Sequence, residues 1–321
     1  MKNFALMGAS GYIAPKHLGA IKDTNNKLLV AYDKSDSVGV IDSFFPKSDF
    51  FVEFERFDRH VDKLRFDEKR KIDYITICTP NYLHDSHIRF ALRNDANAIC
   101  EKPLVLNPWN LDTLIKIQNR TGKKVFNILQ LRLHESIIKL KDIIEKGPKD
   151  KVYDIDLTYI TSRGNWYYAS WKGDVIKSGG LASNIGIHFF DMLCWIFGKV
   201  KINKVHLREH DRSAGYLEFE KARVRWFLSI NNELIPKKQK ALGQRTFRSI
   251  LIEGKEFEFS SGFDKLHTKV YENILNGKGF SIEDARKSIE VAYQIRNVNL
   301  SKIEGDYHPM VRHPLSKHPF L

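Results

Sequence analysis

Apolar residues in the first 130 positions occur in short runs separated by segments with helical spacing. The runs have the length of buried parallel strands. They are Phe4–Met7, Leu28–Tyr32, Ile72–Cys78, Ala98–Cys100 and Val125–Leu131. The helical segments between them are Ile13–Ile21, His84–Leu92 and Pro108–Arg120. Strands that alternate with helices predict an α/β domain with a doubly wound parallel sheet.

The pattern changes after this region to longer segments in which apolar and polar positions alternate. These segments are Lys151–Thr161, Gly215–Ile230 and Thr246–Phe259. Alternation predicts antiparallel strands with one covered face. We therefore predict two domains, an α/β domain over residues 1–127 and an α+β domain over 128–321 built on a mostly antiparallel open sheet.

Composition fits a globular protein but leaves two classes of partner open. The 321 residues are 42% hydrophobic, and no apolar run approaches the about 20 residues of a membrane span. The three cysteines are widely spaced, which favours a reducing cytoplasm. The net charge of +13 is compatible with a basic surface that binds no partner. It is also compatible with a nucleic-acid partner or with a small anionic substrate. No nucleic-acid-binding motif accompanies the charge, so we expect no nucleic-acid or membrane partner.

A glycine turn after the first strand predicts a dinucleotide site. Gly8–Ala14 has the spacing G-x-x-G-x-x-A, and glycine lets the backbone approach a pyrophosphate at a helix N-terminus. Asp33 lies 22 residues after Gly11, close to the ~20-residue offset expected for the acid that binds ribose hydroxyls. An acid at this place repels a 2′-phosphate, so we predict NAD rather than NADP. The predicted cofactor contacts are Gly8, Ser10, Gly11, Tyr12, Ile13, Asp33, Thr79, Asn81, His84, Glu101 and Lys102.

Two further segments carry groups that can manage a proton. Lys102, in Glu101-Lys102-Pro103, follows the fourth strand at the edge where open α/β sheets bind ligands. His188 lies 86 residues later, with Asn184 and Asp191 at helical spacing. Imidazole suits proton transfer near neutral pH. We predict Lys102 and His188 as catalytic residues and leave open which removes the proton. His188 and Asp191 lack a convincing third ligand, so no metal is predicted.

Together these motifs resemble the glucose–fructose oxidoreductase/inositol dehydrogenase (Gfo/Idh/MocA) family. The resemblance spans nearly the whole chain and rests on the glycine turn, Asp33, T-P-N-x-x-H, E-K-P and G-G-(x)5-G-x-H-x-x-D. It implies an N-terminal Rossmann domain, a C-terminal substrate-binding and oligomerisation domain, and a lysine and histidine beside the reacting carbinol. Many members carry aspartate where this chain has Asn184, and Asn184 cannot take a proton.

A narrower resemblance concerns one subgroup of that family. Gly8–His17, Thr161–Trp171 and Ser178–Gly198 are similar to the UDP-N-acetyl-2-amino-2-deoxy-D-glucuronate 3-dehydrogenases of bacterial O-antigen and capsule synthesis, and Asn184 fits this subgroup. The resemblance implies oxidation of the sugar C3 hydroxyl with NAD, in some members with 2-oxoglutarate as the oxidant that recycles NADH. It also implies a cytoplasmic homo-oligomer, a dimer or tetramer formed through the open sheet.

Residues near position 170 suit a charged sugar nucleotide. Arg163 can pair with a carboxylate, the aromatic residues from Trp166 to Trp171 offer faces for a sugar or uracil, and Lys172 and Lys177 can meet a diphosphate. Each aromatic could equally lie in the core or a subunit interface. The predicted substrate contacts are Lys102, Arg163, Asn165, Trp166, Lys172, Asn184 and His188. The alternatives are a dehydrogenase of another sugar or cyclic polyol, and a non-catalytic nucleotide-binding regulator.

Overall fold

A computed structural model describes residues 1–259 and 262–320 as two compact units. Unit 1 contains Met1–Leu133 and Asp264–Arg286, and unit 2 contains His134–Phe263 and Lys287–Leu321. The sequence pattern predicts contiguous domains that meet at residue 127. The division differs because a segment from the second half of the chain packs in unit 1, where Val270, Tyr271 and Ile274 join the hydrophobic core.

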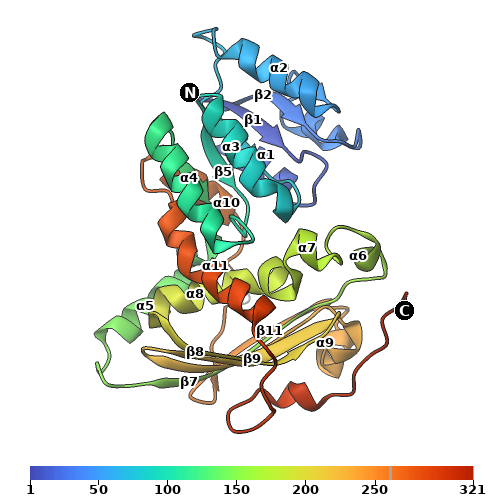
Figure 1. Ribbon diagram of the computed structural model, residues 1–321, viewed down its shortest axis with the longest axis vertical. Helices are drawn as coiled ribbons and strands as arrows, with labels where there is room; N and C mark the ends of the chain where they lie inside the picture. Colours follow the sequence, from blue (N-terminus) through green and yellow to red (C-terminus); the bar gives the residue numbers. More distant parts are fainter. Residues whose placement is uncertain (260–261, 321) are drawn as a thin grey trace. The chain divides into compact units, whose positions relative to one another are not determined.

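Unit 1 is built on a six-stranded parallel sheet with the order β3-β2-β1-β4-β5-β6 (Figure 1). The strands are β1 (Asn3–Met7), β2 (Lys27–Tyr32), β3 (Asp49–Phe51), β4 (Tyr74–Ile77), β5 (Asn97–Cys100) and β6 (Val125–Asn127). The sequence runs from β1 outward through β2 to β3, then returns to β4 on the other side of β1. Such a reversal of strand order is the place where open α/β sheets bind ligands.

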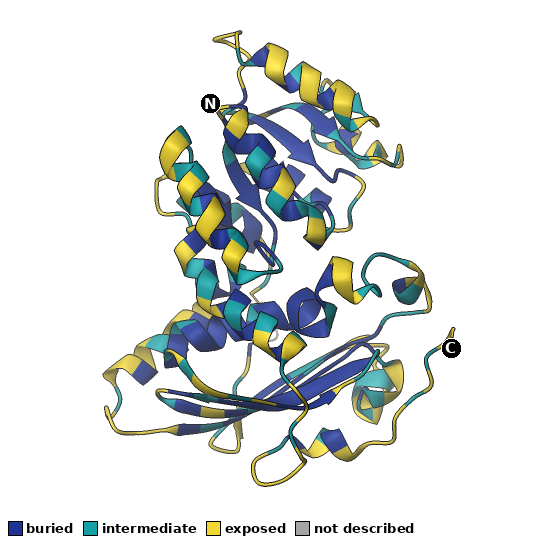
Figure 2. Cartoon of the chain, in the orientation of Figure 1, coloured by how far each residue is buried: buried dark blue, intermediate teal, exposed yellow. Residues whose placement is uncertain are grey.

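Helices cover this sheet with their apolar sides. They are α1 (Ala14–Asp23), α2 (Phe54–Leu64), α3 (His84–Arg93), α4 (Pro108–Thr121) and α10 (Leu266–Leu275). The short 3₁₀ turns are η1 (Gly39–Ser43), η2 (Asn81–Leu83) and η3 (Gln130–Leu133). α1 and α10 lie side by side and pack on β1, where Tyr271 stacks on Phe4 with ring centroids 5.9 Å apart. Strands β1, β4, β5 and β6 are largely buried, β3 is not, and the outer sides of the helices are exposed (Figure 2).

Unit 2 is built on a second six-stranded sheet with the order β12-β11-β7-β10-β9-β8. The strands are β7 (Tyr153–Thr161), β8 (Val200–Arg208), β9 (Arg212–Phe219), β10 (Ala222–Ser229), β11 (Thr246–Ile252) and β12 (Lys255–Glu256). All neighbouring pairs are antiparallel except β10 and β7, which are parallel. The predicted mostly antiparallel sheet is therefore confirmed.

The helical part of unit 2 includes one strongly apolar stretch. Its helices are α5 (Glu135–Lys146), α6 (Trp166–Ala169), α7 (Val175–Ser178), α8 (Ile187–Phe197) and α9 (Lys237–Ala241), with 3₁₀ turns η5 (Asn232–Leu234) and η6 (Pro309–Arg312). Helix α11 (Ile282–Asn297) contains the division between the units. By length and composition alone, Val175–Phe197 could cross a membrane, contrary to the sequence-based expectation. Its most apolar window is 83% buried in the structure, as in the core helix of a globular protein.

Most predicted elements of unit 1 are present, but in both units some boundaries differ and some helices were not predicted. The run at Val125–Leu131 is a strand only to Asn127, after which the chain turns into η3. Gly215–Ile230 is a hairpin of β9 and β10 rather than one alternating strand, and Thr246–Phe259 contains the turn between β11 and β12. Alternation persists across a tight hairpin, so the pattern alone does not locate the turn. The amphipathic helices α2, α5, α10 and α11 were not predicted.

Candidate functional site

The glycine turn lies at the carboxyl end of β1, beside the end of β4. Gly8 has a φ of +91°, and a Cβ built on it would stand 2.6 Å from the backbone carbon of Cys78 and 2.7 Å from the nitrogen of Thr79. Only glycine fits where two strand ends come this close. Ser10 and Tyr12 are exposed on the turn, and Ala14 begins α1. The turn therefore leaves the backbone and the start of α1 accessible, as the pyrophosphate of a dinucleotide requires.

Asp33 follows β2 and lies against this turn. Its Oδ2 accepts the amide N–H of Ser10 at 2.9 Å, and its Oδ1 accepts that of Ser35 at 3.0 Å. The carboxylate is partly exposed, so each oxygen retains a lone pair for a further donor. This arrangement fits the ribose diol of NAD, and it places the acid at the turn as the spacing predicted. The glycine turn and this acceptor carboxylate therefore fit the cofactor inferred from the sequence.

The loop after β4 is held in place by two buried histidines. The Thr79 hydroxyl is 2.9 Å from Nδ1 of His87. Nδ1 of His84 is 2.7 Å from the carbonyl oxygen of Pro103, and its Nε2 is 2.8 Å from that of Thr79. His84 thus joins this loop to the segment that carries Lys102. The cofactor contacts predicted for Thr79, Asn81 and His84 stay predictions, because these bonds give Thr79 and His84 structural roles.

Lys102 follows β5, at the same edge of the sheet as the glycine turn and Asp33. Its side chain is partly exposed, and the Lys102–Pro103 peptide bond is cis. Glu101 is buried, with 6% of its surface exposed. Its Oε2 accepts the Lys102 amide N–H at 3.1 Å, while its Oε1 lies 2.9 Å from Nε2 of His17 and 3.1 Å from Nε2 of His267. The cofactor contact predicted for Glu101 therefore concerns a carboxylate that already has three partners.

In unit 2, the predicted histidine segment forms a helix with an unusual first turn. Ala182–Gly186 is a π-helical turn that leads directly into α8. Gly186 packs tightly, since a Cβ there would stand 2.6 Å from Leu228 and 2.7 Å from Phe190. His188 is partly exposed on α8, whereas Asp191 is buried, with 2% of its surface exposed. The prediction that Asn184 and His188 lie on one regular α-helix is therefore wrong, because Asn184 lies in the π-helical turn. Single π-helical turns within helices are frequent at functional sites.

A cluster of polar groups forms around Tyr167 in the same unit. Nδ2 of Asn184 donates to the Tyr167 hydroxyl at 3.0 Å. Burial raises the pKa of Tyr167, opposed by this bond and by the charge of Arg163. Burial, and then the charge of Arg163, lowers the pKa of Lys172. Two cations are thus held near each other, and in the described part of the chain neither has a carboxylate within 4 Å.

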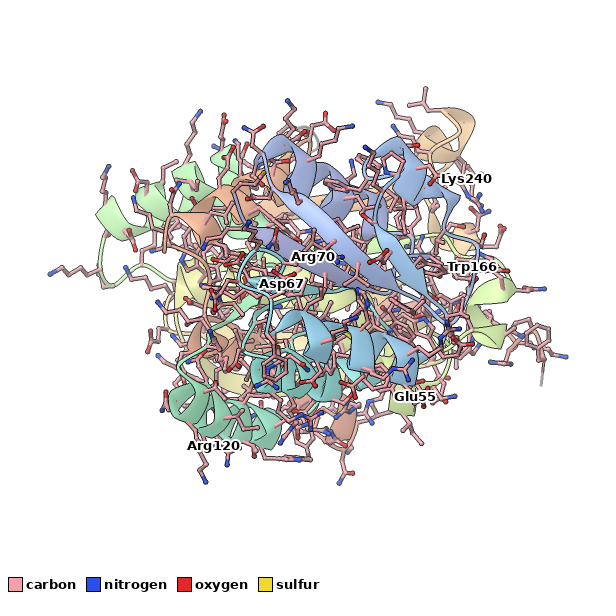
Figure 3. The ribbon with its side chains drawn as sticks, turned by 90° about the horizontal axis from the view of Figure 1, so that it is seen from above. Glu55, Asp67, Arg70, Arg120, Trp166 and Lys240 are labelled. Carbon is pink, nitrogen blue, oxygen red and sulfur yellow. The ribbon has the colours of Figure 1, made fainter. Side chains whose placement is uncertain are left out.

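Two tryptophan rings lie near the ammonium of Lys172. Lys172 Nζ lies 4.5 Å from the ring centroid of Trp171 and 5.7 Å from that of Trp166. Trp166 is 54% exposed on α6, where Figure 3 labels it, and Asn165 is exposed next to it. Two cations that repel each other beside the exposed face of Trp166 suit an anionic ligand with a flat ring. Lys177 differs, because its Nζ pairs with Asp174 at 3.3 Å.

The structure thus groups the predicted residues by unit. The predicted cofactor contacts, Lys102 among them, lie where the strands of unit 1 end, at the carboxyl edge of the sheet. Arg163, Lys172 and Asn184 gather in unit 2, and His188 lies on the helix that follows Asn184. The sequence does not reveal Tyr167 as a partner of Asn184, nor His17 and His267 as partners of Glu101. A lone tyrosine or histidine carries no signal of a contact so distant in sequence.

Comparison with known proteins defines the family. Residues 2–128 match the oxidoreductase family described as having an NAD-binding Rossmann fold. Residues 141–234 match the description "Oxidoreductase family, C-terminal alpha/beta domain" of the same family. The chain therefore belongs to the Gfo/Idh/MocA oxidoreductase family, and the predicted cofactor NAD agrees with this match.

Solved structures extend the similarity over the whole chain. The WlbA (WbpB) dehydrogenase from Thermus thermophilus, in complex with NAD and UDP-GlcNAcA, is 47% identical, with a TM-score of 0.92 over 97% of this chain and 100% of that one. A second structure of that enzyme, in complex with NAD and alpha-ketoglutarate, has the same identity and a TM-score of 0.91 over 100% of both chains.

Curated relatives are more distant. Glucose-6-phosphate 3-dehydrogenase from Bacillus subtilis (strain 168) is 22% identical over 94% of this chain and 77% of its own length. The matches to other relatives, a D-glucoside 3-dehydrogenase and a myo-inositol 2-dehydrogenase among them, cover only 39%, 32% and 38% of those proteins.

Proposed function

We propose that the protein is an NAD-dependent sugar-nucleotide dehydrogenase that oxidises the C3 hydroxyl of UDP-GlcNAcA (UDP-N-acetylglucosaminuronate), in bacterial surface-polysaccharide synthesis. The observation that carries the proposal is the pair of cations Arg163 and Lys172, which have no carboxylate partner in the described residues; Lys172 also lies beside the rings of Trp171 and the exposed Trp166. A uronic-acid sugar nucleotide has a carboxylate, a diphosphate and a uracil ring. The 47% identity to a dehydrogenase bound to NAD and UDP-GlcNAcA supports the same substrate.

In the proposed reaction, NAD supplies the hydride acceptor and the chain supplies binding and proton transfer. The C3–H bond breaks with its electron pair, and the hydroxyl proton leaves to a base, so that a C3 ketone forms. Lys102 hydrogen-bonds the C3 oxygen and shares its proton. His188 is favoured as the general base because a neutral imidazole accepts a proton near pH 7. The side-chain amide of Asn184 cannot take up a proton, so Asn184 orients a hydroxyl rather than taking part in a proton relay.

The NADH formed needs an oxidant, and we propose 2-oxoglutarate for this step. The support is the Thermus thermophilus enzyme in complex with NAD and alpha-ketoglutarate, the same keto acid. The carboxylates of a keto acid suit the same cations that bind the uronic acid. NADH transfers its hydride, which is two electrons and one proton, to the keto carbon, and a proton from the site goes to the keto oxygen. The products are NAD and 2-hydroxyglutarate, so the step balances.

A spectrophotometric assay tests the proposal. Purified protein is mixed with UDP-GlcNAcA and NAD, and absorbance at the NADH band is followed with and without 2-oxoglutarate. The expected result is formation of the 3-keto sugar nucleotide, with turnover beyond one equivalent of bound NAD only when the keto acid is present. Absence of the keto sugar under both conditions would remove UDP-GlcNAcA as the substrate.

A dehydrogenase of another sugar or cyclic polyol is the second candidate. The full-length similarity to glucose-6-phosphate 3-dehydrogenase supports it, although the identity is only 22%. Competition by UDP separates the two candidates: a site for a sugar nucleotide is inhibited by UDP, whereas a site for a free polyol is not. We further propose that the enzyme works in the cytoplasm, where its nucleotide substrates occur, as a homo-oligomer formed through the open sheet of unit 2.

A further inference from the structure

A buried chain of hydrogen bonds in unit 1 ends at the backbone of Lys102. The Thr76 hydroxyl is 2.8 Å from the Tyr271 hydroxyl, which is 2.8 Å from Nδ1 of His17. Nε2 of His17 is 2.9 Å from Oε1 of Glu101, and Oε2 of Glu101 accepts the Lys102 amide at 3.1 Å. Thr76, Tyr271 and His17 are fully buried. Of the residues in this series of hydrogen bonds, only Lys102 has a role in the proposed reaction.

The direction of each bond follows from the charge on Glu101. Burial alone would raise the pKa of the Glu101 carboxyl, but the hydrogen bonds from His17 and His267 hold it well below the usual range. Glu101 is therefore an anion that only accepts. Burial lowers the pKa of His17, which leaves its imidazole neutral with the proton on Nε2. Nδ1 must then accept, so the Tyr271 hydroxyl donates to it, and Thr76 donates to Tyr271.

His267 completes the surroundings of the carboxylate from a third element. It lies on α10, four residues before Tyr271, and its Nε2 is 3.1 Å from the same Oε1 of Glu101. The rings of His17 and His267 meet edge to face, with centroids 5.0 Å apart. One oxygen thus receives two imidazole N–H groups, and the other receives the Lys102 amide. All three donors are satisfied only if both oxygens of Glu101 accept.

The same three side chains could in principle hold a metal ion. The ligand atoms of His17, Glu101 and His267 lie within 4.8 Å of one another. However, the separations of 2.9 and 3.1 Å are those of N–H···O hydrogen bonds. The Tyr271 and Lys102 contacts already give every nitrogen and oxygen on this path a partner of the right kind. The hydrogen-bonded anion therefore accounts for the geometry without an ion.

We propose that Glu101 is a positioning residue: its carboxylate, held between His17 and His267, fixes the backbone of Lys102 and thereby the lysine side chain for the reaction. This inference rests on the proposed function in taking Lys102 as a catalytic residue. It also replaces the cofactor contact predicted for Glu101, whose oxygens already serve three donors. His17 lies on α1, which starts at the glycine turn, so one carboxylate ties the cofactor turn to the lysine.

Two substitutions at Glu101 separate charge from acceptor geometry. Glu101→Gln keeps the shape but has one oxygen, so either the histidine pair or the Lys102 amide faces an NH₂ group. Glu101→Met keeps the length and removes both acceptors. The matched control is His60→Gln, which changes another histidine of unit 1 that pairs with a carboxylate, Asp49, at 3.2 Å.

The first readout is steady-state kinetics with UDP-GlcNAcA, NAD and 2-oxoglutarate. We expect kcat to fall ~10-fold or more in both Glu101 variants, because misplacement of a catalytic group lowers the rate of the chemical step. The KM for the sugar nucleotide and the Kd for NAD should stay within three-fold of the wild type. His60→Gln should retain wild-type values. A kcat within three-fold of the wild type in either Glu101 variant overturns the inference.

The second readout needs no substrate. Hydrogen exchange of the Lys102 amide, followed by residue-resolved NMR or mass spectrometry, should accelerate at least ten-fold in Glu101→Met and stay unchanged in His60→Gln. Unchanged exchange in Glu101→Met overturns the inference, as does stoichiometric metal in the wild-type protein. If Glu101→Met does not fold, the kinetics of Glu101→Gln decide. If the wild type does not oxidise UDP-GlcNAcA, the proposed function has failed, and amide exchange alone decides this inference.

Discussion

Substitution of Gly8 by alanine tests whether the glycine turn is shaped by its contact with β4. The new Cβ would lie 2.6 and 2.7 Å from backbone atoms of Cys78 and Thr79, at a φ of +91°. Backbone at a strand end cannot rotate away as a flexible side chain can. The turn or the strand must therefore shift, and the cofactor turn shifts with it.

The expected magnitude has two parts. A left-handed backbone costs an L-residue roughly 1–2 kcal/mol. Overfilling a packed site costs a further ~1–3 kcal/mol. Gly8→Ala should therefore lower the free energy of unfolding by about 2–5 kcal/mol. Gly122 provides the control, since its φ is +70° and a Cβ there meets nothing within 4 Å. Gly122→Ala should show only the first part, about 1–2 kcal/mol.

Urea unfolding of both variants, with and without saturating NAD, measures their free energies of unfolding. Gly122→Ala gives the cost of the left-handed backbone, and the additional loss in Gly8→Ala gives the cost of overfilling the site. Gly8→Ala should also weaken NAD binding at least ten-fold by titration calorimetry, because the turn is predicted to hold the pyrophosphate. Gly122 follows α4 (Pro108–Thr121), and the Gly122→Ala variant should bind NAD like the wild type. Equal destabilisation by the two substitutions, with unchanged NAD affinity in both, would refute the reasoning.

Four further outcomes are expected. Lys102→Met and His188→Asn should each lower kcat ~10²-fold, the size typical of lost proton transfer, and near-normal rates in both would remove the catalytic assignment. Arg163→Met should raise the KM for UDP-GlcNAcA ~10-fold with a smaller change in kcat, because it removes binding common to substrate and transition state. The wild type should bind NAD more tightly than NADP, and Asp33→Ala should narrow that ratio; comparable wild-type affinities contradict this. Burial lowers the pKa of His87 from 6.5 to about 4, so the unfolded chain binds more protons between these values. Stability should fall by about 3 kcal/mol as pH drops through this window, and His87→Gln should flatten the dependence in urea melts.

Local patterns predicted the first unit well because its signals are local. The strand before Gly8, the glycine spacing and Asp33 follow one another within about thirty residues, and each has a stereochemical reason that depends on near neighbours. The lysine was placed correctly at the edge of the sheet for the same reason, since it follows a recognisable strand. In unit 2 the alternation was visible, but the hairpin turn between β9 and β10 was not.

The cluster of side chains around Tyr167 was predicted only in part. Arg163, Lys172 and Asn184 were chosen for their chemistry, and the structure adds Tyr167 as the side chain that Asn184 contacts. The π-turn before α8 was not foreseen, because a one-residue change of helical register depends on how Gly186 packs against Leu228 and Phe190. The expected i, i+4 relation between Asn184 and His188 requires a regular α-helix, and the packing of Gly186 produces a π-helical turn instead.

By itself, the sequence determined the alternation of strands and helices, the glycine turn with its acid, and the order of the lysine and histidine motifs. These features depend on backbone stereochemistry and hydrophobic periodicity over short distances. Only the tertiary structure decided which distant groups surround the key residues. His17 and His267 lie 84 and 166 residues from Glu101, yet both bond to one of its oxygens. A buried carboxylate needs such donors to remain an anion, and the packing of α1 and α10 supplies them.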